Sequence, residues 1–216
     1  MSEGGVLNLA GPVFLDGVPL DRARAAMVLV HGRGASAQDI LTLVDAFDQP
    51  DFAYLAPQAP NNTWYPYPFT VPLAQNEPYL SSSLAQLGGV VDHLVGAGFP
   101  PGRLIVLGFS QGACLTLEYA ARHARRYGAL AGLSGGLIGP DGLPSDYAGS
   151  FAGTPVFLGC SDVDPHIPKY RVQHAAEVLT GLGASVTTRL YPNMAHTVND
   201  DEVTHVRALM SALTHS

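Results

Sequence analysis

The segment Gly108-Phe109-Ser110-Gln111-Gly112 constrains the fold more than any other part of this chain. It follows an apolar run at 103–107 that is typical of a buried strand, and it opens a helical pattern over 111–122. A strand, a G-x-S-x-G turn and a helix form a nucleophile elbow, in which the serine backbone is strained. The glycines let the strand and the helix approach closely, and the helix N-terminus points N–H groups at developing negative charge. The segment therefore predicts Ser110 as a nucleophile.

The composition is that of a compact α/β protein. Its 216 residues are 47% hydrophobic and 13% charged, which fits one domain over residues 1–216. The net charge of −7 and the lack of any Lys/Arg run argue against a nucleic-acid partner, which would require a basic surface. No apolar run is long enough to span a bilayer, and residues 1–5 do not read as a signal peptide. We therefore expect no integral membrane association.

Cys114 and Cys160 are the two cysteines of the chain, and their spacing is not that of metal ligands. We interpret both as small buried hydrophobic residues, because neither lies at the elbow. The two cysteines could pair, but a reduced protein is the simpler interpretation, so a cytoplasmic location is expected. The sequence leaves open whether the protein forms a homo-oligomer.

Strand-like and helical segments alternate along the chain. The strands are expected at 6–15, 25–31, 52–56, 103–109, 128–133, 154–160 and 185–191. The helices are expected at 37–45, 77–94, 111–123, 168–181 and 201–214, with Ser36 and Asn76 as N-caps of the first two. This alternation predicts an α/β fold with a mostly parallel central sheet flanked by helices. The site of such a sheet lies at the carboxyl ends of its strands.

A serine hydroxyl needs a general base, and the base needs a carboxylate that orients it. Behind a nucleophile elbow the chain order is Ser, acid, His, so both partners are sought after residue 110. Asp141 and Asp146 lie in a Gly/Pro-rich segment, where aspartates commonly serve turns. Asp162 and Asp164 directly follow the strand at 154–160. We favour Asp164 as the acid, because Asp162 is suited to capping the turn.

Five histidines follow Ser110 and are candidates for the base. Four fall in predicted helices or the C-terminal tail: His123, His174, His205 and His215. His166 is too close to Asp164 in sequence to bridge easily to the elbow. His196 lies in the loop after the last predicted strand, 185–191, a position that suits a base reaching back to the serine. The sequence therefore predicts His196 as the general base.

Backbone N–H groups are expected to form an oxyanion hole. One donor should be Gln111, the residue after the nucleophile, and the second should come from the loop after an early strand. The strand at 25–31 runs into Gly32-Arg33-Gly34, so Arg33 N–H is the predicted second donor. The Arg33 side chain has two interpretations, contact with an anionic part of a substrate or simple exposure to solvent.

A proline-rich loop at 57–76 carries four aromatic residues within six positions. These residues are Trp64, Tyr65, Tyr67 and Phe69. They either line a substrate pocket or pack the loop onto the body of the protein, and at least one ring is expected in the pocket.

With these residues placed, the chain resembles the phospholipase/carboxylesterase family of the α/β-hydrolases, which includes acyl-protein thioesterases. The resemblance runs from about residue 25 to beyond residue 196. It rests on four motifs: His31-Gly32-x-Gly34, Gly108-x-Ser110-x-Gly112, Asp164-Pro165-x-Ile167-Pro168 and Tyr191-x-x-Met194-x-His196. It implies an α/β-hydrolase fold without a large lid and without a metal or organic cofactor. It also implies Ser110 as nucleophile, Asp164 as acid and His196 as base.

The resemblance implies a serine hydrolase that cleaves carboxylic esters, thioesters or lysophospholipids of small acyl substrates. Two departures lie beside the expected acyl pocket: Arg33-Gly34-Ala35-Ser36, where the family often has leucine and Gly-Asp, and the additional aromatic residues after Trp64. The alternatives are a peptidase or dienelactone-type hydrolase on the same fold, and a non-catalytic binding protein. The dienelactone-type enzymes normally carry cysteine at the elbow, and a binding protein would be expected to lack one of the three candidate catalytic residues.

Overall fold

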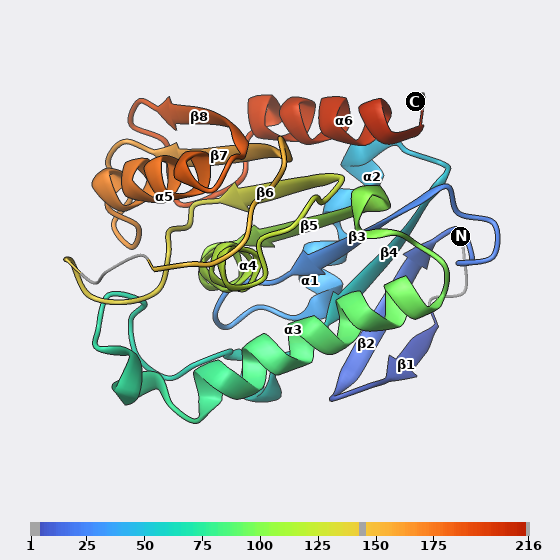
Figure 1. Ribbon diagram of the computed structural model, residues 1–216, viewed down its shortest axis with the longest axis horizontal. Helices are drawn as coiled ribbons and strands as arrows, with labels where there is room; N and C mark the ends of the chain where they lie inside the picture. Colours follow the sequence, from blue (N-terminus) through green and yellow to red (C-terminus); the bar gives the residue numbers. More distant parts are fainter. Residues whose placement is uncertain (1–4, 143–145, 215–216) are drawn as a thin grey trace.

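The computed structural model describes residues 5–142 and 146–214, which form an eight-stranded sheet between two layers of helices (Figure 1). The strand order is β1-β2-β4-β3-β5-β6-β7-β8. The strands are β1 (Val6–Asn8), β2 (Pro12–Gly17), β3 (Ala25–Val30), β4 (Phe52–Pro57), β5 (Leu104–Phe109), β6 (Ala129–Leu133), β7 (Pro155–Ser161) and β8 (Ser185–Tyr191). All pairings from β4 to β8 are parallel, whereas β1 and β2 are added antiparallel at one edge. The predicted α/β fold with a mostly parallel sheet is thereby confirmed.

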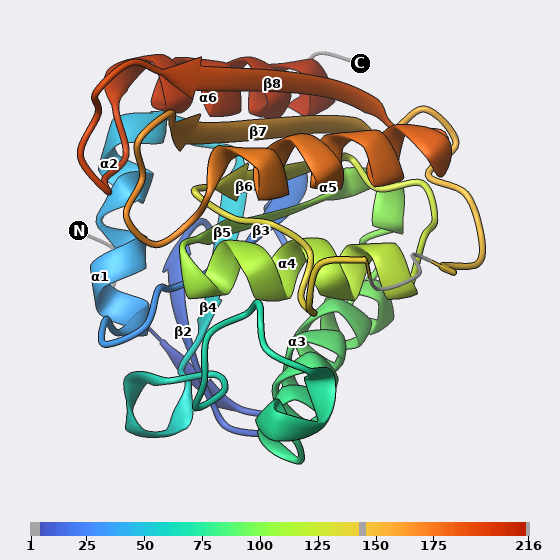
Figure 2. The same ribbon diagram turned by 90° about the vertical axis from the view of Figure 1, so that its left-hand side faces the viewer.

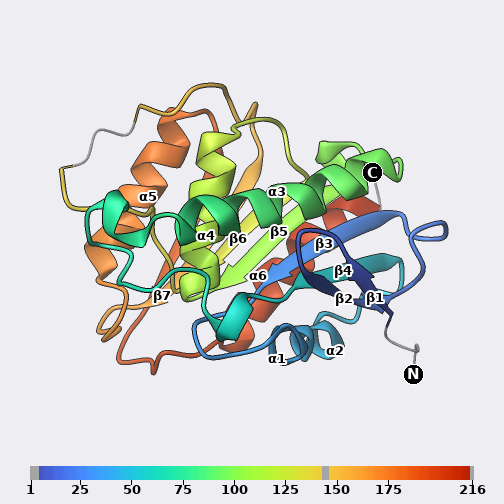
Figure 3. The ribbon, with the colours of Figure 1, turned by 90° about the horizontal axis from the view of Figure 1, so that it is seen from below.

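The helices cover both faces of the sheet (Figure 3). They are α1 (Ala37–Leu41), α2 (Leu43–Phe47), α3 (Tyr79–Gly96), α4 (Gln111–Arg122), α5 (Lys169–Gly181) and α6 (Asp200–Thr214). One apolar core lies between the sheet and α3, α4 and α5, and a second lies between the sheet and α1, α2 and α6. Successive residues of β3 alternate between the two cores, because side chains point to opposite faces of a strand. No helix of the described part of the chain is long and apolar enough to cross a bilayer.

The N-terminal segment is a hairpin and not the single strand expected over 6–15. The backbone turns at Gly11, which has a φ of 152°, and Val6 then pairs with Phe14. A continuous apolar pattern does not reveal this reversal, since the alternation of side chains has the same period on both arms of the hairpin. The hairpin extends the sheet beyond β4 and leaves the position of β3 unchanged.

The first helix begins where it was expected but is divided. The Ser36 side chain accepts from Asp39 N, and the Asp39 carboxylate accepts from Ser36 N, which completes a capping box. The helix is interrupted at Thr42, whose hydroxyl donates to the Asp39 carbonyl oxygen. Local hydrogen bonding by threonine competes with the regular helical ladder, and two short helices result where one was predicted.

The predicted cap of α3 is wrong. Asn76 is buried, and its side chain accepts from Tyr67 N and donates to the Pro68 carbonyl oxygen. The helix begins two residues later than expected, with Pro78 at its N-cap. The Asn76 amide therefore fixes the shape of the proline-rich loop at 57–76, called the aromatic loop from here on, which lies beside the beginning of α4 (Figure 2).

Candidate active site

The two central strands bring together the elbow and the segment Gly32-Arg33-Gly34, called the glycine loop from here on. Strands β3 and β5 pair in parallel, with Val30 opposite Gly108, so both chains leave the sheet at the same edge. Ser110 has φ 55° and ψ −120°, a strained conformation for a residue with a side chain. A Cβ on Gly112 would lie 2.1 Å from the Val30 carbonyl oxygen, so glycine alone permits this approach of α4 to β3.

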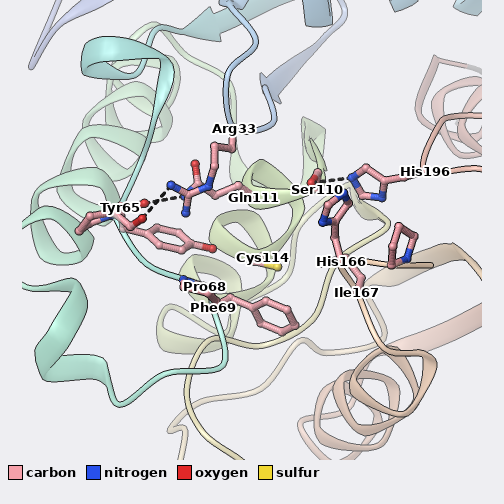
Figure 4. Close-up of a pocket in the computed structure, with 12 residues that line it drawn as sticks. Arg33, Tyr65, Pro68, Phe69, Ser110, Gln111, Cys114, His166, Ile167 and His196 are labelled. Atoms are coloured by element: carbon pink, nitrogen blue, oxygen red, sulfur yellow. Dashed lines mark hydrogen bonds between the residues drawn. The ribbon is translucent and has the colours of Figure 1, made fainter. Parts of the chain in front are cut away.

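Three of the predicted site residues meet through hydrogen bonds (Figure 4). The Ser110 Oγ lies 2.8 Å from His196 Nε2, and His196 Nδ1 lies 2.7 Å from Asp164 Oδ2. Asp164 follows β7 and His196 follows β8, so neighbouring strands deliver both residues to the same edge as Ser110. The ring of Phe109 packs 4.9 Å from the His196 ring and limits its position.

Asp164 is held as a carboxylate. Its Oδ1 accepts from the backbone N–H groups of His166 and Ile167, at 2.8 and 2.9 Å. Burial opposes ionisation, but the hydrogen bond from His196 and these two amides outweigh it and lower the pKa of Asp164 from its ordinary value. An ionised Asp164 requires the proton of a neutral His196 to reside on Nδ1, which leaves Nε2 as the acceptor for the Ser110 hydroxyl.

The other candidates for acid and base lie elsewhere or serve the loops. Asp162 Oδ1 accepts from Asn193 N, which ties the loop after β8 to the loop after β7. Asp141 pairs with Arg171, with 3.0 Å between its Oδ1 and Arg171 Nη1. No hydrogen bond of the described residues joins another histidine to Ser110, and His215 lies outside those residues.

Two backbone N–H groups beside Ser110 have no acceptor within the described protein. They are those of Arg33, which follows β3, and of Gln111, the first residue of α4. A Cβ on Gly32 would lie 3.3 Å from Ser110 Cβ, which shows how closely the glycine loop approaches the serine. The first N–H groups of a helix have no intrahelical partner, so Gln111 N–H is available to an oxygen at the serine.

A cavity of about 620 Å³ opens on Ser110 and His196. Its walls come from the glycine loop, the aromatic loop, the beginning of α4 and the loop after β7 (Figure 4). The lining residues other than Ser110 and His196 are Arg33, Tyr65, Pro66, Pro68, Phe69, Gln111, Cys114, Pro165, His166 and Ile167. A concave, mostly apolar cavity with a few polar groups is the usual form of a small-molecule site.

Only two of the four aromatic residues proposed for the pocket line it. Tyr65 and Phe69 do, whereas Tyr67 is 53% exposed and Trp64 is buried beneath the loop. The Trp64 indole N–H donates to the His31 carbonyl oxygen at 2.8 Å, because a buried indole requires an acceptor. The pocket expectation is therefore wrong for Trp64 and Tyr67.

The Gln111 side chain connects the aromatic loop to the elbow. Its Oε1 accepts from Trp64 N at 3.0 Å, and its Nε2 donates to the Tyr65 carbonyl oxygen at 2.8 Å. Both groups of the amide are thus satisfied in a buried position. This side chain therefore positions the loop that forms one wall of the cavity.

Sequence reasoning missed two lining residues for which a signal existed. Cys114 lies one helical turn after Ser110, and residues at i and i+4 share a helix face. Burial raises the pKa of its thiol to about 12, which keeps it neutral. His166 is too close to Asp164 in sequence to suggest itself as the base, but its ring lies 4.9 Å from the His196 ring and lines the cavity.

Glu202, a third residue missed from the sequence, lies behind the His196 loop. It is buried at the beginning of α6, and its Oε2 accepts from Asn199 N, the end of the loop that carries His196. Asn199 Oδ1 in turn accepts from Glu202 N. Among the residues that the structure describes, the Glu202 Oε1 has no hydrogen-bond partner, and burial raises the pKa of this carboxyl to about 7.

No group of three or more His, Cys, Asp or Glu side chains within residues 5–142 and 146–214 is arranged to hold a metal ion. The chemistry that these residues offer is that of a serine activated by an oriented histidine, next to free N–H donors.

Comparison with known proteins assigns the chain to a family. The family model described as Phospholipase/Carboxylesterase matches residues 18–214. The crystal structure of a phospholipase/carboxylesterase from Dyadobacter fermentans is 41% identical, covers 98% of this chain and 99% of its own, and superposes with a TM-score of 0.89.

Curated relatives point to the same family. Acyl-protein thioesterase 1 of Gibberella zeae is 25% identical, with 97% of each chain covered. A probable carboxylesterase of Arabidopsis thaliana, SOBER1-like, is 24% identical over 86% of this chain and 78% of its own. The chain therefore belongs to the phospholipase/carboxylesterase family of α/β-hydrolases, as a hydrolase of the carboxylesterase and thioesterase type.

Proposed function

We propose that the protein hydrolyses carboxylic esters or thioesters through an acyl-enzyme formed on Ser110, with His196 as general base and Asp164 as the orienting acid. The observation that carries the proposal is the continuous hydrogen-bonded chain from Ser110 Oγ to Asp164 Oδ2 at the wall of the cavity. Such a chain activates a hydroxyl that would otherwise be a weak nucleophile.

The reaction has two steps. In the first, His196 Nε2 accepts the Ser110 proton as Oγ attacks the carbonyl carbon, and the N–H groups of Arg33 and Gln111 stabilise the oxyanion. His196 then gives the proton to the leaving oxygen or sulfur, and the C–O or C–S bond breaks. In the second, His196 takes a proton from water as the water oxygen attacks the carbonyl carbon of the acyl-enzyme. His196 then returns this proton to Ser110 Oγ, the bond between the carbonyl carbon and Oγ breaks, and the carboxylic acid leaves.

Asp164 acts on His196 throughout both steps. Its carboxylate fixes the Nδ1–H tautomer and stabilises the imidazolium that forms when His196 holds the extra proton. The amides of His166 and Ile167 hold the carboxylate in place, so the imidazole is oriented before substrate binds.

The substrate class follows from the size and character of the cavity. About 620 Å³ accommodates a small acyl group, and Tyr65, Phe69 and Ile167 offer it apolar contact. Lysophospholipids belong to the same chemical class and are included in the proposal. The two cysteines are free and buried, which supports the expected cytoplasmic location.

The test is the hydrolysis of p-nitrophenyl esters from acetyl to palmitoyl by the wild type, Ser110→Ala and Ser82→Ala. Loss of the nucleophile is expected to lower kcat on the order of a million-fold. Ser82 is an exposed serine of α3, so its substitution is the matched control and should leave the rates unchanged. A fluorophosphonate probe should label the wild type and the control but not Ser110→Ala.

Two results would overturn the proposal. One is hydrolysis by Ser110→Ala at the wild-type rate. The other is folded wild-type protein that neither hydrolyses any ester of the series nor reacts with the probe, which would favour a binding protein on the same fold. The chain length with the highest kcat/KM would measure how much of the cavity the acyl group fills.

A further inference from the structure

The cavity beside Ser110 has a charge character opposite to that of the whole chain. The chain has a net charge of −7, yet no described residue that lines the cavity is an aspartate or a glutamate. The lining includes instead one guanidinium, that of Arg33, and two imidazoles, those of His166 and His196. The guanidinium is the permanent charge of this described lining, and a concave site that carries a positive charge concentrates anionic ligands.

The Arg33 guanidinium is held in place by the aromatic loop. Its Nη1 donates to the Pro66 carbonyl oxygen at 2.9 Å, and its Nη2 donates to the Tyr67 carbonyl oxygen at 3.0 Å. Its Cζ lies 5.9 Å from the centre of the Tyr65 ring. Because three contacts fix its position, the guanidinium loses little freedom when a ligand binds.

The charge of Arg33 is not neutralised within the described protein. None of the ion pairs among the described residues includes it, and the two carbonyl oxygens that it contacts are uncharged. These bonds use two of the five N–H groups of a guanidinium. The side chain is exposed, so the remaining N–H groups are accessible to a ligand in the cavity.

The position of Arg33 relative to the serine indicates which part of a substrate it meets. In Figure 4, Arg33 and Tyr65 lie on one side of Ser110, and His196 lies on the other. His196 must protonate the leaving group, so the leaving group occupies the His196 side. The acyl group then extends toward the Arg33 side.

We propose that Arg33 selects esters whose acyl group carries a distal anionic oxygen group, such as the free carboxylate of a dicarboxylic half-ester. This inference rests on the proposed function, since it names the substrate class of the same site. The apolar wall formed by Tyr65 and Phe69 contacts the methylene spacer, and the guanidinium binds the carboxylate through charge-assisted hydrogen bonds. The Arg33 backbone and side chain therefore bind different oxygens of one substrate.

The test compares two esters that differ only in charge. Mono-4-nitrophenyl adipate carries a free carboxylate, and 4-nitrophenyl methyl adipate carries the same chain with the carboxylate masked. Adipate is chosen because its carboxylate would have to close a seven-membered ring to attack its own ester. The ratio of kcat/KM for the acid to kcat/KM for the methyl ester is measured from nitrophenolate release for wild type, Arg33→Gln, Arg33→Lys and Arg24→Gln.

Arg24 offers the matched control. It is an exposed arginine directly before β3, at the opposite end of the strand from Arg33, and its substitution changes the net charge by the same amount. We expect the ratio to fall about tenfold in Arg33→Gln and to stay at the wild-type value in Arg24→Gln. Arg33→Lys should keep part of the preference, because the charge remains and the planar fork is lost. Added salt should lower the wild-type ratio.

The ratio separates a contact with substrate from a structural role of Arg33. If the side chain only holds the aromatic loop, Arg33→Gln lowers both rates together and the ratio stays constant, which overturns the inference. If wild type hydrolyses both esters and the ratio of kcat/KM values is the same in wild type and Arg33→Gln, the inference is overturned and the proposed function is left intact. Absence of hydrolysis of both esters by folded wild type, together with absence of probe labelling, overturns the proposed function and the inference with it.

Discussion

The buried carboxyl of Glu202 makes the stability of the protein depend on pH in a direction opposite to that of most carboxyl groups. Burial raises its pKa from 4.5 to about 7 in the folded state, whereas the unfolded chain retains the ordinary value. Between these two pH values the folded protein holds a proton that the unfolded chain has released. The contribution of Glu202 to the free energy of unfolding is therefore highest below pH 4.5 and falls as the pH rises toward 7.

The magnitude follows from the two pKa values. At about 1.4 kcal/mol per pH unit, their difference corresponds to about 3 kcal/mol once both states are ionised. Less than about 1 kcal/mol of this loss is present at pH 5, and most of it is present at pH 8. Glu202→Gln removes the ionisation and keeps an oxygen that accepts from Asn199 N, so its stability should lack this dependence.

The assay is urea unfolding, followed by circular dichroism from pH 5 to pH 8 at constant ionic strength. The free energy of unfolding of wild type minus that of Glu202→Gln should fall by about 2 to 3 kcal/mol over this range. Burial also lowers the pKa of His31, so the free energy of unfolding gains a contribution from His31 as the pH rises from 5 to 8. This contribution is the same in wild type and Glu202→Gln, so it cancels in the difference between them. Glu177→Gln, at an exposed position of α5, is the control. Parallel curves for wild type and Glu202→Gln would refute the reasoning.

Three further substitutions test the site and the packing of the elbow. Asp164→Asn should lower kcat on p-nitrophenyl esters about ten-thousand-fold without loss of the circular dichroism signal. The reason is that an amide facing His196 Nδ1 leaves the imidazole proton on Nε2, which then cannot accept the Ser110 proton. A kcat within tenfold of wild type would contradict this role of Asp164. Gly112→Ala should destabilise the fold by at least about 3 kcal/mol, since its Cβ would lie 2.1 Å from a carbonyl oxygen of β3. Gly89 lies in the middle of α3, where an added Cβ would meet no atom of the described residues within 4 Å apart from its chain neighbours and the backbone of its own helix. Gly89→Ala should therefore stabilise the fold by about 0.5–1 kcal/mol, and urea unfolding in which both variants shift in the same direction would contradict the packing argument.

Much of the fold could be predicted from local pattern. The apolar run before Ser110 and the helical pattern after it correspond to β5 and α4 within one residue at each boundary. The strand at 185–191 is observed with the predicted bounds. Strongly periodic segments between turn residues are the easiest to predict, because the hydrophobic pattern and the local propensity agree there.

Two of the errors lie where a polar side chain binds a partner outside its own helix or strand. Asn76 has the residue type of a helix cap, but its amide binds the backbone of the aromatic loop. Trp64 is of the residue type expected in a pocket, but its indole finds an acceptor at His31, beneath the loop. A polar group that becomes buried binds whichever partner the fold brings near, and the sequence does not name that partner.

The sequence by itself determined the fold family, the elbow at Ser110 and the choice of Asp164 and His196 as its candidate partners, because each follows a strand and parallel strands end at one edge of the sheet. Only the tertiary structure decided what surrounds them. The unneutralised charge of Arg33 in the cavity and the buried carboxyl of Glu202 behind the His196 loop arise from contacts between segments distant in sequence. Burial and the absence of a partner set the energy of a charged group, and both are properties of the packed molecule.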